Sequence, residues 1–353
     1  RQVDLERDPE TQRRLLVRLA DLREEILGDV PGAIAAHRQR IELDPGDVDA
    51  MSALERLLEQ TEQWGALVEV LRMRDGAISD VGEQKDIARR IGVIFEAQLD
   101  DPENAIAAYN DVLSRFGTDA ETLGSLSSLY EQAERWEDLL EVAEMVYGMA
   151  EQAPQRAAVR YQMGEIMRVY TGSVERAVEA YAEVLELVPD HEGALASLWT
   201  VMAADGVAGV DSSAPTEREA REGGPGEETA GDEERDDGEQ PLVYAMDVRI
   251  EAARVLVPRY EAGADYDSLL TALLVRAASE DPLERFGALR RAAEVADLGL
   301  QDPTRSFDLQ CRAVRAGLSE DDLGRMLEEL GRFARDAGRW SDYVALLREV
   351  GPE

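Results

Sequence analysis

A repeat with a step of 72 residues is the feature that most constrains this chain. Residues 33–37 (AIAAH) return as residues 105–109 (AIAAY) and again as residues 177–181 (AVEAY), each copy 72 residues after the one before. Other landmarks keep the same step: Leu54, Leu126 and Leu198, and also Trp64 and Trp136. Self-similarity at a fixed period is typical of repeat architectures, in which each unit buries its apolar face against its neighbours.

Each 72-residue unit divides into two halves, and each half has the pattern of two helices joined by a turn. In one half, a helix over 14–27 is followed by a turn at 28–31 and by a second helix that Pro45 ends. In the other half, a helix over 48–60 is followed by a new helix at Trp64. Apolar residues recur three and four positions apart and alternating strand patterns are absent, so the sequence predicts an all-α chain.

At these positions the chain resembles the tetratricopeptide repeat (TPR) family. The family's small residue at the start of the second helix, its aromatic residue four positions later and its helix-ending proline recur here: Ala33, Ala105 and Ala177; Tyr109 and Tyr181, with His37 in the first copy; Pro45 and Pro189, with Gly117 in the second. The family's first-helix glycine is mostly missing, and Gly331 is its clearest match. The resemblance implies a right-handed α-solenoid of helix-turn-helix repeats over residues 10–204 and 242–350; a HEAT-like or other α-solenoid is the alternative.

An acidic segment interrupts the repeats. Residues 205–240 hold thirteen acidic and three basic residues and almost no large apolar side chain. Because such a segment cannot bury enough surface to offset its ordering entropy, we expect residues 205–241 to be a disordered insertion, either a long loop or a linker between two helical arms. The register resumes at Asp302-Pro303 and at Trp340.

The charge balance narrows the classes of partner. The chain has 75 acidic against 38 basic residues, a formal net charge of −37. Nucleic acid and anionic membrane surfaces would be repelled, so we expect a protein or peptide partner. No apolar stretch of about 18 residues occurs that could cross a membrane. Because the chain begins at Arg1 without a basic-then-apolar leader, we expect a fragment or a processed chain, with the cytoplasm favoured. Lys85 is its only lysine, which favours a bacterial source.

The residues expected of an enzyme are missing from the sequence. No glycine-rich phosphate loop occurs, and His37, His191 and Cys311 have no spacing that would form a metal site or a catalytic triad. A lone helical cysteine is typically a buried apolar residue. We therefore predict a non-enzymatic chain with no catalytic residue, cofactor or metal site.

The recurring tryptophans Trp64, Trp136 and Trp340 have two interpretations. They are either ligand-stacking aromatics or core residues that pack between consecutive helix pairs. Because a landmark that recurs in register is better explained by the stacking of repeats, we predict core packing. Trp199 lies outside this register and could cap an exposed repeat.

The resemblance also implies where a partner would bind, because the family's groove is lined by the first helix of each pair. One equivalent groove position falls on five residues, which we call the first-helix row: Arg18, Arg90, Gln162, Arg254 and Arg291. Arginine forks there could pair with a partner's carboxylates. The alternative, which we favour, is intramolecular pairing, with Arg18 near Glu25 and Arg90 near Glu55.

The function that follows is a scaffold or adaptor that binds a peptide or helix on its concave face. Two alternatives remain: an architectural spacer without a specific ligand, and the regulatory repeat region of a larger enzyme. The oligomeric state stays open.

Overall fold

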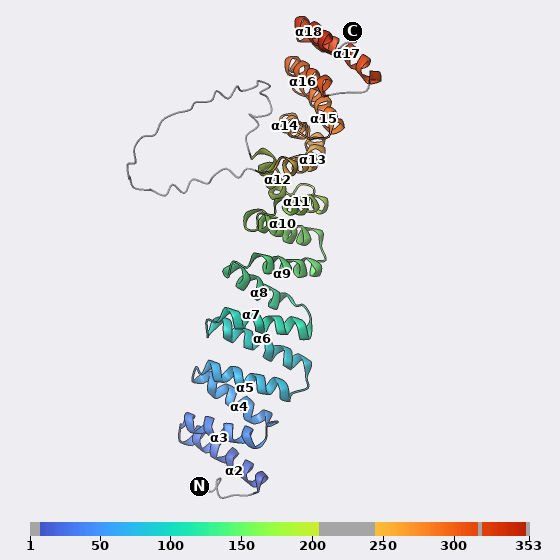
Figure 1. Ribbon diagram of the computed structural model, residues 1–353. Helices are drawn as coiled ribbons and strands as arrows, with labels where there is room; N and C mark the ends of the chain where they lie inside the picture. The colour runs from blue at the N-terminus through green and yellow to red at the C-terminus, as the bar shows by residue number, and fades with distance from the viewer. Residues whose placement is uncertain (1–7, 205–243, 317–319, 351–353) are drawn as a thin grey trace, which may run out of the picture. The chain divides into compact units, whose positions relative to one another are not determined.

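The computed structural model describes residues 8–204, 244–316 and 320–350 (Figure 1). Within these ranges the chain is all-α, as the sequence predicts. The predicted insertion at 205–241 lies outside the described residues. The chain divides into two units, residues 1–149 and 150–353, and each is described by itself.

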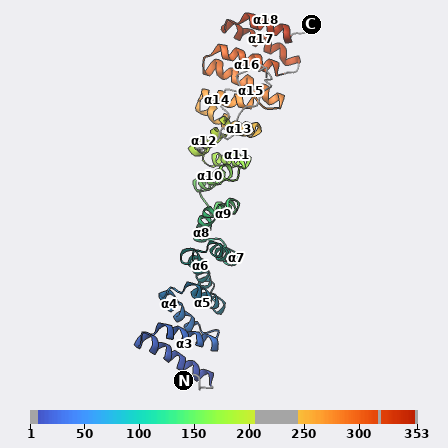
Figure 2. The same cartoon turned by 60° about the vertical axis from the view of Figure 1, so that its left-hand side comes forward.

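The first unit is a series of antiparallel helix pairs (Figure 1, Figure 2). Its helices are α2 (Pro9–Asp21), the π-helical turn η1 (Leu22–Ile26), α3 (Val30–Leu43), α4 (Val48–Gln60), α5 (Trp64–Ala77), α6 (Val81–Ala97), α7 (Pro102–Phe116), α8 (Ala120–Gln132) and α9 (Trp136–Met149). Each even-numbered helix packs against the helix that follows it, and each pair packs against the next pair. This is the helix-turn-helix arrangement that the 72-residue repeat predicts.

The second unit contains the same kind of pair, with one irregularity at α12. Its helices are α10 (Ala153–Val169), α11 (Val174–Leu187), α12 (Glu192–Ala203), α13 (Met246–Gly263), α14 (Tyr266–Arg276), α15 (Pro282–Glu294), the π-helical turn η3 (Val295–Gly299), α16 (Pro303–Arg315), α17 (Glu320–Asp336) and α18 (Trp340–Val350). The pairs are α10 with α11, α13 with α14, α15 with α16, and α17 with α18. Helix α12 stands between two pairs and packs against α13.

A left-handed backbone residue marks the turn inside every pair. It lies two positions before the first residue of the second helix, at Gly28, Glu62, Asp100, Glu134, Gly172, Ala264, Gln301 and Gly338. An aspartate at the helix N-cap often follows it, as where Asp101 accepts a hydrogen bond from the backbone N–H of Asn104 at 3.1 Å. Such a cap satisfies one of the free N–H groups of the first turn. The turn therefore defines the pairs independently of packing, and by this criterion α12 lacks a second helix among the described residues.

In two of the pairs, a glycine of the first helix contacts the ring of a tyrosine of the second helix. A Cβ added to Gly92 would lie 2.6 Å from the Tyr109 ring, and one added to Gly164 would lie 2.6 Å from the Tyr181 ring. In the first copy the same positions hold Ala20 and the smaller ring of His37. The first-helix glycine that the sequence pattern shows clearly only at Gly331 is therefore also present at Gly92 and Gly164.

The tryptophans are not the buried core residues that the sequence predicts. Trp64 and Trp136 are half-buried, and Trp340 is 46% exposed, with its ring edge-on to Tyr343. Each is the first residue of a helix, a position that leaves part of the side chain accessible here. Trp199 of α12 packs edge-on against Tyr260 of α13, with ring centroids 5.9 Å apart. Leucine, valine, isoleucine and alanine side chains fill the core, and Tyr109 and Tyr181 are among its largest fully buried residues.

Candidate functional site

The residues of the first-helix row all lie on the first helix of a pair, as the resemblance implies. They are on α2, α6, α10, α13 and α15 in chain order. Arg18 and Arg90 belong to the first unit, and Gln162, Arg254 and Arg291 belong to the second. Arg90 is half-buried and the other four are exposed. The contacts of these five side chains are therefore described within each unit.

In the first unit, one of the two predicted intramolecular contacts is present. Arg90 lies 3.3 Å from the carboxylate of Glu55 and 2.9 Å from that of Glu59, both on α4. Glu55 is almost fully buried and also receives Arg74 at 3.1 Å. Arg18, in contrast, makes no ion pair with Glu25 or with any other residue in the described part of the chain. The predicted contact with Glu25 is therefore wrong; Arg18 lies in the last turn of α2 and Glu25 in the π-helical turn η1.

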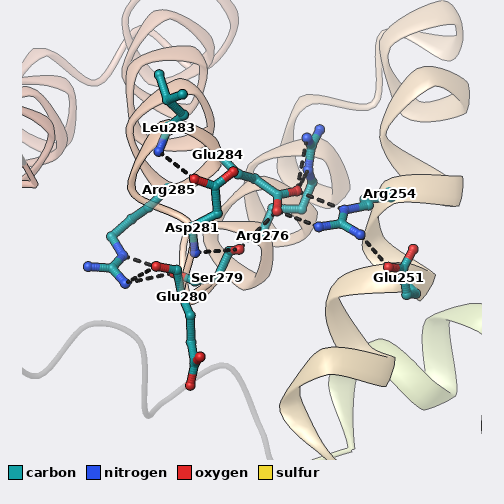
Figure 3. Close-up of polar contacts among 9 residues, drawn as sticks. All are labelled: Glu251, Arg254, Arg276, Ser279, Glu280, Asp281, Leu283, Glu284 and Arg285. Carbon is teal, nitrogen blue, oxygen red and sulfur yellow. Dashed lines mark hydrogen bonds and ion pairs between the residues drawn. The ribbon is translucent and has the colours of Figure 1, made fainter. Parts of the chain in front are cut away.

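In the second unit, Arg254 is the centre of a polar cluster (Figure 3). Its Nε donates to Glu284 Oε1 at 2.8 Å, and its two terminal nitrogens contact Glu284 and Glu251. Glu284 also accepts hydrogen bonds from Ser279 Oγ at 2.9 Å and from Arg276 at 3.3 Å. These donors, Arg254 above all, lower the pKa of Glu284 to about 2 although partial burial opposes the shift. Glu284 is thus ionised at neutral pH, where it pairs with Arg254.

The turn between α14 and α15 holds Glu284 in place beside Arg254. Arg285 folds back so that its Nη2 donates to the carbonyl of Ser279 at 2.8 Å. The backbone N–H of Leu283 donates to Asp281 Oδ1 at 3.1 Å, which caps the start of α15 (Figure 3). Because the turn is tied at both ends, Glu284 enters the first turn of α15 facing α13.

Arg291, near the end of α15, forms a second ion pair between α15 and α13. Its Nε donates to Glu261 of α13 at 2.8 Å, and its Nη1 donates to Glu294 of its own helix at 2.8 Å. Both carboxylates raise the pKa of the Arg291 guanidinium. Gln162 is exposed and makes no hydrogen bond with another described residue. Three of the five residues in the row are therefore paired with carboxylates of a neighbouring first helix, and Arg18 and Gln162 are not.

Two hollows of the second unit border α13. One of about 500 Å³ is lined by Arg254 and Glu251, by apolar Met246 and Ile250, and by the turn at 278–281. The other, of about 320 Å³, lies between α11 and α13. In the ranges that the structure covers, no group of three or more histidine, cysteine or acidic side chains could hold a metal ion. None of the helices described is long and apolar enough to cross a bilayer.

The pairing of helices defines a TPR-like repeat fold. No protein-family model matches the sequence, and no curated protein matches it either. Among solved structures, the chain is similar to YrrB, described as a TPR protein with an unusual peptide-binding site, at 18% identity over 52% of this chain and 89% of that one, with a TM-score of 0.30. A tetratricopeptide repeat protein from Parabacteroides merdae matches at 11% identity over 90% and 98%, with a TM-score of 0.30. The yeast Sti1 TPR2AB domain in a pHSP90 complex matches at 15% identity over 93% and 99%, with a TM-score of 0.28. These likenesses concern the fold alone.

Proposed function

We propose that the chain is a non-enzymatic scaffold that binds a peptide or helix along the first helices of its pairs. The observation that carries this proposal is the position of Arg254, a member of the first-helix row, in the wall of a 500 Å³ hollow. Polar and apolar groups line that hollow together, which is typical of surfaces that orient and hold a ligand. Helix-pair repeats present such surfaces without supplying chemistry of their own.

The charges of the row favour a partner with carboxylates of its own. Arg18 is exposed and free of ion pairs within the described residues, so an acidic group can reach it without displacing another. At Arg254 and Arg291 the neighbouring glutamates hold the guanidinium groups in fixed orientations, and an incoming carboxylate would have to exchange with them. We infer weak to moderate affinity from each site, with specificity coming from the spacing of the row's members within each unit.

The nucleophilic groups of the described residues support a non-catalytic chain. Cys311 is buried, and burial raises the pKa of its thiol to about 11, so the reactive thiolate is scarce at neutral pH. Burial likewise lowers the pKa of His37, which packs in the core of the first pair. We also propose that residues 10–204 and 242–350 are two helical arrays joined by residues 205–241.

The architectural alternative is that the chain only spaces other parts of a protein. It is favoured by the ion pairs that already satisfy Arg90, Arg254 and Arg291, because such pairs rigidify neighbouring repeats and leave little for a ligand. A regulatory repeat region of a larger enzyme would share the same surface, and the full-length sequence distinguishes it from an independent adaptor.

Selection from a displayed library of random peptides tests the proposal. Peptides selected on the wild-type chain should bind the Arg18→Ala, Arg90→Ala, Arg291→Ala triple variant at least roughly tenfold more weakly, since three cations of the row are gone. The matched control is Arg38→Ala, Arg72→Ala, Arg348→Ala, which removes three exposed arginines from second helices and should change affinity less than about twofold.

Two outcomes would contradict the scaffold proposal. Selected peptides that bind the first-helix triple variant as tightly as wild type place the site elsewhere. A library that yields no binder above background favours the spacer. Circular dichroism melting of all three proteins checks that each remains folded.

A further inference from the structure

Among the described residues no second helix follows α12, and α11 packs against α13. In the regular register, α12 corresponds to α4 and α8, whose second helices begin at Trp64 and Trp136. The corresponding position after α12 falls outside the described residues. Within the second unit, α13 instead packs against both α12 and α11, and the buried Arg249 donates from Nε to the carbonyl of Met202 at the end of α12 at 2.9 Å.

The surface that results is a groove between α11 and α13, which we call the α11–α13 groove. It has a volume of about 320 Å³ and eight lining residues, four from each helix: Glu175, Val178, Glu179 and Ala182, and Asp247, Val248, Glu251 and Val255. The valines and the alanine are buried or half-buried and form its floor. All four carboxylates are exposed, and two of them come from each helix. The groove is therefore apolar below and acidic on both sides.

The equivalent position one repeat earlier, in the first unit, carries a carboxylate that has an arginine partner. Glu103 on α7 is the residue 72 positions before Glu175, and it lies 3.7 Å from Arg135, which immediately precedes α9. In the register, the position of Arg135 maps to Val207, whose structure is not described. Among the described helices, α13 packs against α11 on this side and brings Asp247 and Glu251 into the groove.

The charges of the groove are left largely uncompensated. Glu251 contacts Arg254 on its own helix. Glu175, Glu179 and Asp247 make no ion pair with any residue of the described ranges. The hollow bordered by α5 and α7 in the first unit is different, since there Arg115 lies 2.9 Å from Asp75 and 3.0 Å from Asp111. Carboxylates gathered on both walls of one groove repel each other, and a cationic ligand would relieve that repulsion.

We propose that the α11–α13 groove binds a cationic amphipathic helix of another protein, with apolar side chains on the valine floor and lysine or arginine side chains beside the four carboxylates. The floor residues Val178 and Ala182 are four apart on α11, so the groove runs along a helix and suits a ligand with helical spacing. The groove shares Asp247 and Glu251 with the hollow beside Arg254, but its α11 wall, with Glu175 and Glu179, borders only the groove. A loss of binding caused by changes at Glu175 and Glu179 is therefore distinguishable from a failure of the first-helix row.

Charge excludes the two occupants that the chain itself could supply. The adjacent segment 205–240 has thirteen acidic and three basic residues, so the acidic walls would repel it. A second copy of the chain, with a net charge of −37, would be repelled in the same way. A foreign basic segment is the complementary ligand.

The test uses a defined probe, a capped helical peptide of leucine and lysine about five turns long with one leucine face. Its binding to the full chain is measured by fluorescence anisotropy at low and physiological salt. The groove variant is Glu175→Gln, Glu179→Gln, Asp247→Asn. The control variant, Glu186→Gln, Glu192→Gln, Asp267→Asn, removes the same charge from exposed positions on α11, α12 and α14 outside the groove.

We expect the groove variant to bind the probe at least about tenfold more weakly than wild type and the control variant less than about twofold more weakly. Ala182→Lys, which places a cation of the chain's own in the groove, should also weaken binding. Equal losses in both triple variants would show attraction to net charge alone and would overturn the proposal. So would unchanged binding by the groove variant, or a rise of about fivefold when residues 205–240 are replaced by a short glycine-serine linker, which would assign the groove to that segment.

Discussion

Gly92 lies directly beneath the ring of Tyr109, so close that a Cβ on Gly92 would lie 2.6 Å from Cε1 of the tyrosine. The tyrosine is buried, and its hydroxyl donates to Glu96 at 2.7 Å, which fixes the ring across the first helix. Gly164 and Tyr181 repeat the contact 72 residues later, where Tyr181 donates to Glu165 at 2.5 Å. The close approach of the two helices in each of these pairs therefore depends on a missing side chain.

Gly92→Ala tests this contact. The added methyl group has to displace a ring that is packed on all sides and tied to Glu96, so we expect a loss of about 2 to 3 kcal/mol in the free energy of unfolding. The matched control is Gly124→Ala on α8, where nothing lies within 4 Å of the added Cβ. This substitution should stabilise the chain by up to about 1 kcal/mol. Urea unfolding measures both. Equal stability of the two variants would contradict the proposed role of the glycine.

The left-handed residue in the turn of each pair gives a second prediction. Glu134, in the turn between α8 and α9, has φ 53°, and the turn of the next pair, between α10 and α11, has Gly172 at φ 66°. A side chain in this conformation costs about 1 kcal/mol, so Glu134→Gly should stabilise the chain by several tenths of a kcal/mol after the entropy cost of glycine, and Gly172→Ala should destabilise it by about 1 kcal/mol. Thermal unfolding followed by circular dichroism checks the opposite signs. A loss of stability in Glu134→Gly would show that its side chain stabilises the turn.

The features that recur locally could be predicted from the sequence. Helix starts, the Asp-Pro turns and the pairing of α15 with α16 follow from capping and periodicity, which short-range interactions decide. The contact of Arg90 with Glu55 also followed, because equivalent helices in neighbouring pairs lie side by side. The exposure of Trp340 did not, because an aromatic at the first position of a helix can face the core or the solvent with the same sequence pattern.

The groove between α11 and α13 could not be predicted at all. Its carboxylates belong to two helices that are separated in the sequence by the 58 residues 188–245. The repeat register is broken between these helices. Which helix meets α11 depends on packing rather than on local pattern. The one available signal was indirect: Glu175 keeps the position of Glu103, but no arginine stands at the place of Arg135.

The depressed pKa of Glu284 gives a prediction about acid stability. Because its pKa is about 2 in the folded chain, against an ordinary value of 4.5, the contribution of Glu284 to stability is present above pH 4.5 and is lost as the pH falls toward 2. Glu284→Gln should therefore lower the melting temperature at pH 6 and make little difference near pH 2. Glu280→Gln is the control, since that exposed side chain takes no part in the Arg254 network. A pH-independent difference between Glu284→Gln and wild type would show that packing, and not charge, is what the residue contributes.

The contact between Arg249 and Met202 predicts how the chain responds to changes at 205–240. Met202 lies in the last turn of α12, Arg249 lies in the first turn of α13, and both are buried, so the two helices that flank that segment are joined by direct packing. Replacing residues 205–240 by a short glycine-serine linker should leave the melting temperature within a few degrees of wild type.

Arg249→Met keeps the apolar stem but removes the donor, and we expect it to cost about 1 to 3 kcal/mol because a buried carbonyl loses its partner. Limited proteolysis of the wild-type chain should cut first within 205–240, because polar segments with few large apolar residues are preferred cleavage sites. A linker variant that unfolds, or one that melts far below Arg249→Met, would show that the segment itself packs against the helices and that the α12–α13 contact is not sufficient to join them.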